Sequence, residues 1–299
     1  MGDRPLKGIP VKRLLLTAAV AVGCAVPSAP GEEAPAAGGA IRLLVRADDL
    51  ATSHAANEAC IKSFQSGIAR SVEVVVPGPW YPEAVALLKE SPGYDAGVHL
   101  CLTSEWEKVK WRPLTSAPGL ADARGFFYPM VRQRKDFPPG TGFLDAKPKA
   151  EEVERELRAQ IERAKADIPQ LSHLSDHMGA AQSTPEFKAI VQKLAAEYGL
   201  PIEARGAKGF NGFGGGPRAT PEEKEATLAA NLEKLGPGTW ILVEHPGLDV
   251  PEMRAQGHLG YETVAIDREG VTRAFTSPKV LAAVKARGIR LVSYAEVNR

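Results

Sequence analysis

Two adjacent carboxylates, Asp48 and Asp49, end a short apolar run that begins at Ile41. Like charges at contact distance repel, and a buried carboxylate loses its hydration, so such a pair at the end of a buried strand needs a positive partner. A metal ion is the commonest partner. A helix N-cap with a charged neighbour would place the same two residues here without any chemistry. What the other predicted strands carry at the same end decides between these interpretations.

Four of the six histidines lie at the ends of predicted strands. They are His99, His173, His177 and His245. Because the carboxyl ends of parallel strands meet at one edge of a sheet, we expect these imidazoles to lie near the carboxylate pair. One carboxylate with two imidazoles is a common ligand set for a divalent metal, and it leaves positions open for water and substrate. A lone histidine on an apolar strand is more often a core residue, but four at one edge favour a site.

The spacing of apolar residues predicts strands and helices that alternate along the chain from residue 41. Strands are predicted over 41–47, 71–76, 95–102, 171–176, 202–205, 239–244 and 289–294, and helices over 54–67, 82–89, 149–167, 185–199, 222–235 and 278–287. This alternation is typical of a parallel sheet, open or closed into a barrel. The sequence therefore predicts an α/β fold of about seven strands in one domain, residues 41–299.

The first 40 residues have a different composition. Basic residues between Arg4 and Arg13 precede an apolar stretch that is short for a membrane span. This pattern predicts a signal peptide over residues 1–29 and a linker over 30–40, and hence export to the periplasm or the extracellular space. The residues before Cys24 resemble a bacterial lipoprotein box, so a lipid anchor on Cys24 is a second option. The mature chain keeps Cys60 and Cys101, either as one disulfide or as two buried thiols.

Charge balance excludes one class of partner. The 299 residues carry 37 Lys and Arg against 36 Asp and Glu, a net charge of +1. Without a basic cluster or an interleaved aromatic stripe, we expect no nucleic-acid partner. The composition leaves the oligomeric state open, with a homodimer among the options.

Four short motifs, in order, resemble those of the YdjC/ChbG-like carbohydrate deacetylases. They are Ala47–Ser53 with Asn57, Gly97–Thr103, Ser172–His177 and Glu244–Gly247. The resemblance implies that family's NodB-like fold, a distorted parallel (β/α) barrel. It also implies Asp49, His99 and His177 as ligands of one divalent ion, Mg²⁺ or Zn²⁺, with Asp48 as the catalytic base and His245 facing the leaving group.

The chain departs from this family pattern near the implied ligands. Leu50 and Ala51 stand where the family usually has Phe-Gly, and its Asp-Ser-His appears as Ser175-Asp176-His177. We therefore expect a changed surrounding of the metal, supported by either Ser175 or Asp176. Glu73, a charge inside a predicted strand, either lines the pocket or points to solvent.

The resemblance implies a metal-dependent hydrolase that removes an acetyl group from an N-acetylated sugar or oligosaccharide. A metal-bound water would attack, Asp48 would take its proton, and His245 would protonate the leaving amine. Arg205 would orient His245, Asp48 or a substrate hydroxyl, unless it forms only a surface ion pair. Aromatic residues suited to a sugar lie nearby in the sequence: Trp80, Tyr81, Trp106, Trp111, Phe126, Phe127 and Tyr128. The alternatives are a metal-dependent hydrolase of another amide, an ester or a phosphodiester, and a non-catalytic secreted sugar-binding barrel.

Overall fold

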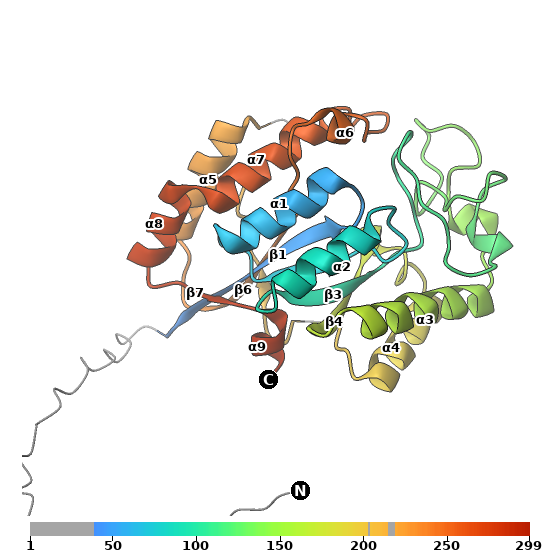
Figure 1. The fold of residues 1–299 in the computed structure, drawn as a ribbon, viewed down its shortest axis with the longest axis horizontal. Coiled ribbons are helices and arrows are strands. Elements are labelled where there is room, and N and C mark those ends of the chain that lie inside the picture. Colours follow the sequence, from blue (N-terminus) through green and yellow to red (C-terminus); the bar gives the residue numbers. More distant parts are fainter. Residues whose placement is uncertain (1–38, 203, 215–218) are drawn as a thin grey trace, which may run out of the picture. The chain divides into compact units, whose positions relative to one another are not determined.

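The structure, a computed structural model, describes residues 39–202, 204–214 and 219–299 (Figure 1). The predicted signal peptide, Cys24 and nearly all of the linker lie outside these ranges. Within them, no helix combines the length and the apolar character that a membrane crossing requires.

A parallel sheet forms the centre of the fold. Its strands are β1 (Ile41–Leu50), β2 (Ser71–Val74), β3 (Asp95–Leu100), β4 (Leu171–Asp176), β5 (Lys208–Gly209), β6 (Gly238–Glu244) and β7 (Arg290–Val292). The order across the sheet is β4-β3-β2-β1-β6-β5, and β7 also pairs with β1. Every pair is parallel, and in the described residues β4 and β5 do not pair, so the sheet is a half-barrel. The predicted α/β class with about seven strands is confirmed.

Helices surround the sheet (Figure 1). The α-helices are α1 (His54–Gln65), α2 (Tyr81–Glu90), α3 (Ala150–Asp167), α4 (Pro185–Tyr198), α5 (Pro221–Glu233), α6 (Pro251–Arg254), α7 (Val264–Thr276), α8 (Pro278–Ala286) and α9 (Tyr294–Asn298). Short 3₁₀ helices are η1 (Pro118–Leu120), η2 (Leu144–Ala146) and η3 (His177–Gly179). Three helices begin with a capping hydroxyl followed by proline, at Thr184, Thr220 and Ser277. The hydroxyl accepts a free N–H of the first turn, and proline costs no hydrogen bond there.

One predicted strand is wrong, one helix was missed, and the open question about the cysteines is decided. The predicted strand over 202–205 is wrong, because Ile202, Ala204 and Arg205 belong to no strand and β5 begins at Lys208; residue 203 lies outside the described residues. Helix α7 was not predicted, although its apolar residues recur at helical spacing. Cys60 and Cys101 are buried free thiols, so they form no disulfide.

Strands β2 and β3 are buried along their whole length and β1 along most of it, as expected for the centre of a parallel sheet, whereas β5 is exposed. Apolar residues such as Leu43, Val45, Val72 and Leu174 fill the space between strands and helices. Polar residues interrupt this core on β2, β3 and β4: Glu73, His99, His173 and Ser175 are all at most 2% exposed. Buried polar groups require partners, and these groups partner one another.

Candidate metal centre

The backbone at the end of β1 gives the two adjacent carboxylates different surroundings. The pairing of β1 with β2 shifts between Ala47 and Leu50, and φ is 73° at Asp49 and 82° at Ala51. Non-glycine residues rarely adopt this conformation, so local contacts must hold it. The Ala51 N–H donates to Asn57 Oδ1 over 2.7 Å, and the Thr52 hydroxyl donates to the Asp49 carbonyl over 2.8 Å. Ala51 thus adopts a glycine-like conformation at a position where the resembling family has glycine.

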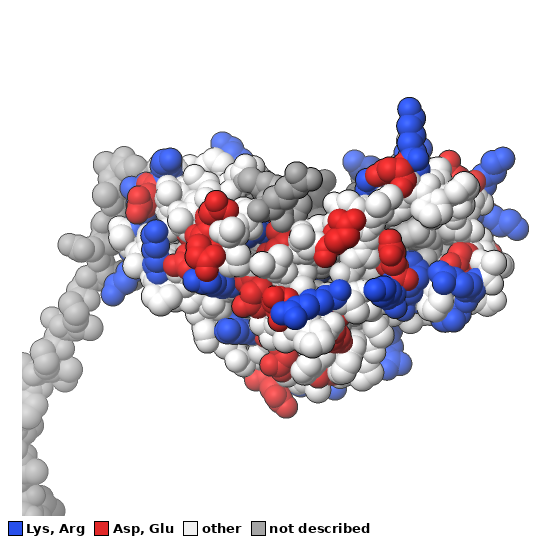
Figure 2. Space-filling view, turned by 90° about the horizontal axis from the view of Figure 1, so that it is seen from above, with Lys and Arg blue, Asp and Glu red and all other residues white. Residues whose placement is uncertain are grey.

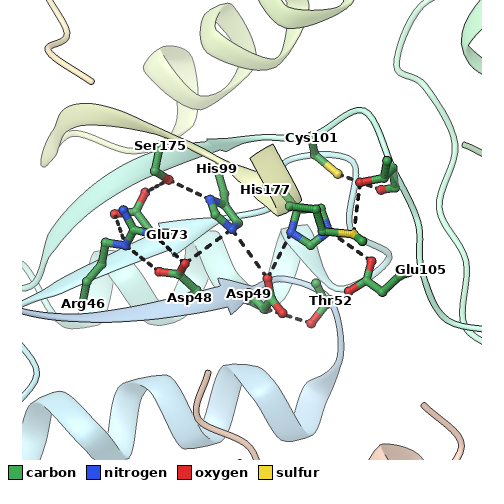
Figure 3. A network of polar contacts seen from close by, with 12 residues as sticks. Arg46, Asp48, Asp49, Thr52, Glu73, His99, Cys101, Glu105, Ser175 and His177 are labelled. Carbon is green, nitrogen blue, oxygen red and sulfur yellow. Dashed lines mark hydrogen bonds and ion pairs between the residues drawn. The ribbon is translucent and has the colours of Figure 1, made fainter. Parts of the chain in front are cut away.

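Asp49 lies between two imidazoles (Figure 3). Its Oδ1 is 3.7 Å from Nε2 of His99, on β3, and 3.4 Å from Nδ1 of His177, which follows β4 directly. One candidate ligand atom from each residue lies within 4.8 Å of the others, and all three side chains are buried. The structure therefore brings together the three residues that were predicted as metal ligands.

A divalent cation fits this cluster. Asp49 Oδ1 is buried and has no hydrogen-bond partner among the described residues, while Oδ2 accepts from Arg268 Nη2 over 2.7 Å. An unpaired buried carboxylate oxygen is costly, and a cation at this position would satisfy it. One carboxylate and two imidazoles match the donor preferences of Zn²⁺ and its neighbours in the transition series.

Burial and neighbouring charges shift the pKa values of all three candidate ligands. Burial and the neighbouring His177 hold the pKa of His99 well below its ordinary value, so His99 is neutral. Burial opposes ionisation of Asp49, but Arg268 and His245 outweigh it and hold the pKa of Asp49 well below its usual range. Burial also opposes charge on His177, yet the Glu105 carboxylate raises the pKa of His177 well above its ordinary value. A bound cation would replace the proton that His177 otherwise carries.

Asp48 lies beside the three candidate ligands and is held by Arg46. Arg46 binds it with two parallel hydrogen bonds, Nε to Oδ1 over 2.7 Å and Nη2 to Oδ2 over 2.8 Å. Asp48 Oδ2 lies 3.6 Å from His99 Nε2, beside the three candidate ligands. Arg46 was missed at the sequence level, although residues two apart on a strand share a face. The bidentate pair fixes the Asp48 carboxylate next to the candidate metal position.

A cavity of about 600 Å³ opens over this cluster. Its lining comes from the strand ends, from the segments that follow them and from helices α5 and α7: Asp48, Asp49, His99, Glu105, Trp106, Asp176, His177, Met178, Gly179, Phe213, Lys224, Glu244, His245, His258, Tyr261, Asp267 and Arg268. His245 is among them, as predicted. The volume is in the range typical of small-molecule sites.

Arg205 does not reach this cavity. Its side chain is exposed, its backbone N–H donates to Asn298 Oδ1 over 2.8 Å, and it borders a different surface hollow. The expectation that Arg205 orients His245 or Asp48 is therefore corrected. Arg46 and Arg268 occupy the positions beside the carboxylate pair.

Loop and helix residues that the sequence did not single out complete the site. Glu105 Oε2 accepts from His177 Nε2 over 3.0 Å, and the guanidinium carbon of Arg268 lies 5.1 Å from the centre of the Trp106 ring. Tyr261 packs against the same ring at 6.1 Å. Trp106, which was expected near a sugar, thus forms part of the cavity wall.

The open question about Ser175 and Asp176 is answered by their contacts. Ser175 Oγ lies 2.7 Å from His99 Nδ1, whereas Asp176 accepts the backbone N–H groups of Ala181 and Gln182, each over 2.9 Å. Ser175 therefore supports a ligand histidine and Asp176 supports the turn after β4. Burial raises the pKa of Asp176 to about 6. Glu73 neither lines the cavity nor faces solvent, because it is fully buried beneath Ser175.

The outer surface agrees with the balanced composition. Figure 2 shows acidic and basic side chains side by side over most of the face in view. Mixed charge of this kind gives no extended basic footprint on that face.

Comparisons with known proteins agree with the fold and identify the family. A carbohydrate deacetylase of Thermus thermophilus is 33% identical over 242 residues, which cover 73% of this chain and 82% of that protein. A carbohydrate deacetylase of Brevibacillus brevis is 33% identical over 163 residues, covering 54% of this chain and 58% of its own. A solved structure from Enterococcus faecalis, whose name refers to cellobiose-phosphate cleavage, superposes with a TM-score of 0.68 at 22% identity, over 87% of this chain and 99% of that one.

The family model described as YdjC-like protein matches residues 42–286. This span contains every candidate ligand and all the strands apart from β7 and the first residue of β1. The same span holds the four motifs on which the sequence-level resemblance rested. The chain belongs to the YdjC-like family.

Proposed function

We propose that this protein is a metal-dependent hydrolase that removes an acetyl group from an N-acetylated sugar or oligosaccharide. The observation that carries the proposal is the buried cluster of Asp49, His99 and His177, with an unpartnered Asp49 oxygen and an Arg46-bound Asp48 beside it. Relatives named carbohydrate deacetylases support the choice of reaction.

The chain's own residues divide the reaction between them. A divalent cation held by Asp49, His99 and His177 supplies Lewis acidity and a more acidic water. Asp48 accepts the proton of the attacking water, and the bidentate contact with Arg46 holds its carboxylate in position. His245, on the same cavity, donates a proton to the departing amine. Arg268 holds the second oxygen of Asp49, so that Oδ1 stays directed at the two imidazoles.

The cavity wall suits a sugar. The partly buried Tyr261 ring lines the cavity in front of the buried Trp106, and the ion pair of Lys224 with Asp267 lies on the same wall. Sugars combine apolar ring faces with hydroxyl groups, so a wall that mixes aromatic and charged groups matches both features. A volume of about 600 Å³ limits the bound portion to a few sugar units at most.

The direct test is acetate release by the full-length protein. Purified protein is assayed on N-acetylated mono- and disaccharides, after chelation, and after addition of Mg²⁺, Zn²⁺ or Co²⁺. We expect chelation, Asp49→Ala and His177→Ala each to abolish release, while His54→Ala, an exposed histidine paired with Glu83, retains it. Release that survives both ligand substitutions would refute the site.

Two further outcomes distinguish the alternatives. Hydrolysis of an ester or a phosphodiester in place of the acetamide would keep the metal site and change the substrate class. Sugar binding without any hydrolysis, in protein that carries a metal, would favour the non-catalytic sugar-binding interpretation. Asp48→Asn tests whether Asp48 is the base or a metal ligand. If Asp48 is the base, the variant should keep its metal content and lose the rate of acetate release.

We also propose that the protein is exported. The supporting observation is the basic and apolar pattern of residues 1–29, with a lipid anchor on Cys24 as the variant of this proposal. Cell fractionation tests it. A soluble periplasmic or secreted pool supports signal cleavage, membrane association that Cys24→Ala abolishes supports the lipid anchor, and a cytoplasmic pool contradicts export.

A further inference from the structure

Glu73 is a fully buried carboxylate beneath the candidate metal site (Figure 3). It lies on β2 and contacts two side chains of β4. His173 Nε2 is 2.6 Å from Glu73 Oε1, and the Ser175 hydroxyl donates to Glu73 Oε2. Arg46 Nε lies 3.8 Å from Oε1. Burial favours the protonated acid, but His173 and Arg46 outweigh it and lower the pKa of Glu73, so the group is an ionised acceptor.

An ionised carboxylate accepts hydrogen bonds and donates none. This fixes which group donates and which accepts in each hydrogen bond from Glu73 through Ser175 to His99. The Ser175 proton points to Glu73, so Ser175 Oγ is an acceptor toward His99. His99 Nδ1 lies 2.7 Å from that oxygen and therefore carries the ring proton. An imidazole with a single proton on Nδ1 has none on Nε2, so this nitrogen directs a lone pair at Asp48 and Asp49.

The opposite direction would disable the site. If Ser175 donated to His99 Nδ1, the ring proton would move to Nε2, which lies 3.6 Å from Asp48 Oδ2 and 3.7 Å from Asp49 Oδ1. A protonated nitrogen is no metal ligand, and its N–H would occupy the space between the carboxylates. The position of one hydroxyl proton thus decides whether His99 can bind a cation.

Gly97 makes the long-range contact between β2 and β4 feasible. It lies on β3, between the two strands, in register with Glu73 on one side and His173 on the other. A Cβ at this position would overlap both His173 Nε2 and Glu73 Oε2. Only glycine leaves the gap through which the two side chains meet over the middle strand.

We propose that Glu73, acting through the Ser175 hydroxyl, fixes the ring proton of His99 on Nδ1 and so presents Nε2 as a metal ligand. Glu73 and Ser175 are positioning residues, and neither touches the substrate. The inference rests on the proposed function only for the identity of what His99 binds, because the tautomer itself is a property of the ion-free protein.

The test is the tautomer of His99 in ion-free, full-length protein with ¹⁵N-labelled histidine, assigned through His99→Gln. We expect the wild type to show a protonated Nδ1 and an unprotonated Nε2. In Glu73→Gln the amide oxygen accepts from His173, and the amide N–H then donates to Ser175. The Ser175 hydroxyl turns to His99, and the ring proton moves to Nε2. Ser175→Ala should give a mixture, and Ser175→Thr, which keeps the hydroxyl, should restore the wild-type pattern.

Ser172→Ala is the matched control. Its hydroxyl lies 2.8 Å from His173 Nδ1, at the far end of the same network, and does not contact His99. The wild-type tautomer should persist in this variant. A wild-type His99 protonated on Nε2, or a tautomer unchanged in both Ser175→Ala and Glu73→Gln, would overturn the proposal. Should Glu73→Gln fail to fold, the Ser175→Ala and Ser175→Thr pair gives the same decision.

Cation binding supplies the second readout. Titration with Zn²⁺ or Co²⁺ should show an affinity about 10- to 100-fold weaker in Glu73→Gln than in the wild type, with Ser172→Ala unchanged. Failure of the wild type to bind any cation would contradict the proposed function and leave the tautomer result to stand. Equal affinity in the wild type and in a variant with a shifted tautomer would contradict the positioning role alone.

Discussion

Glu73 and Glu244 lie on β2 and β6, the two strands beside the carboxyl end of β1, and their pKa values are shifted in opposite directions. Glu73, on β2, is fully buried yet has a lowered pKa, because His173, Ser175 and Arg46 surround it. Glu244, on β6, faces the cavity. Burial raises its pKa to about 7, helped by Asp267 and Asp48 and opposed by Lys224.

This difference shows that burial alone does not decide protonation. Burial opposes the charge in both cases, and the neighbouring charges and hydrogen-bond partners decide the outcome. On the β2 side the polar groups form a closed network that contacts His99, a candidate ligand. On the β6 side a carboxyl group with a raised pKa faces the cavity.

Gly97→Ala tests the network on the β2 side and has the largest expected effect. The added Cβ would collide with Glu73 and His173, so the network must open. We expect an overpacking cost of about 1–3 kcal/mol in unfolding free energy and at least about a tenfold loss of cation affinity. Urea unfolding and a Zn²⁺ titration measure both. Gly93→Ala is the control, since its Cβ would meet Phe64 Cζ at an ordinary 3.6 Å. Equal behaviour of the two variants would refute the role of Gly97.

Glu105→Gln tests the direct contact of a carboxylate with His177, for comparison with the contact of Glu73 with His99 through Ser175. Glu105 accepts from His177 without an intervening hydroxyl, and it raises the pKa of that ring. Glutamine keeps an acceptor and removes the charge, so cation affinity should fall about tenfold. Glu107→Gln, at an exposed position two residues away, serves as the control. An unchanged dissociation constant in Glu105→Gln would show that His177 needs no charged support.

The pH dependence of stability should have opposite signs for the two glutamates. From about pH 4.5 to about 7 the unfolded chain releases the Glu244 proton while the folded protein keeps it, so this group lowers stability as the pH rises. Glu244→Gln removes that loss, and its stability relative to the wild type should rise over this window by on the order of 3 kcal/mol.

Glu73 has a lowered folded pKa, so its stabilisation is present above the unfolded pKa and is lost as the pH falls through the folded value. Glu73→Gln should therefore be most destabilising above about pH 5. Urea unfolding at pH 3, 4, 5, 6, 7 and 8 measures both variants. Parallel pH profiles for the two would contradict the assignment of their charges.

Arg205→Ala should have the smallest effect. The side chain is exposed and does not border the cavity, so kcat/KM should stay within about twofold of the wild type. Arg268→Ala is the contrasting substitution, because Arg268 holds Asp49 Oδ2 and is buried. If Arg205→Ala lost activity as severely as Arg268→Ala, the described position of Arg205 would not be the functional one.

The strand ends were predictable from the sequence because each signal is local. Apolar runs located β1 and β4, and the polar residues at the strand ends pointed to the Asp48-Asp49 pair and to nearby histidines. The choice of Asp49, His99 and His177 as ligands came from the family resemblance. The supporting residues are different in kind. Arg268 and Asp49 are 219 positions apart, and Ser175 and Glu73 are 102 apart.

Periodicity shows which face of an element is apolar, but it does not show which elements pack together. Helix α7, which carries Arg268, escaped prediction, and the loop that carries Glu105 has no repeating pattern. Glu73 was noticed as unusual on its strand, but only the register of β2, β3 and β4 shows that Gly97 lets it reach Ser175.

Asp49, His99 and His177 are proposed to bind one divalent cation. Anomalous diffraction from crystals of the protein grown or soaked with Zn²⁺ or Mn²⁺ tests this binding. We predict one strong peak within bonding distance of Asp49 Oδ1, His99 Nε2 and His177 Nδ1, and no such peak in His177→Ala. A peak that contacts His99 through Nδ1, a peak elsewhere in the cavity, or no peak in the wild type would contradict it.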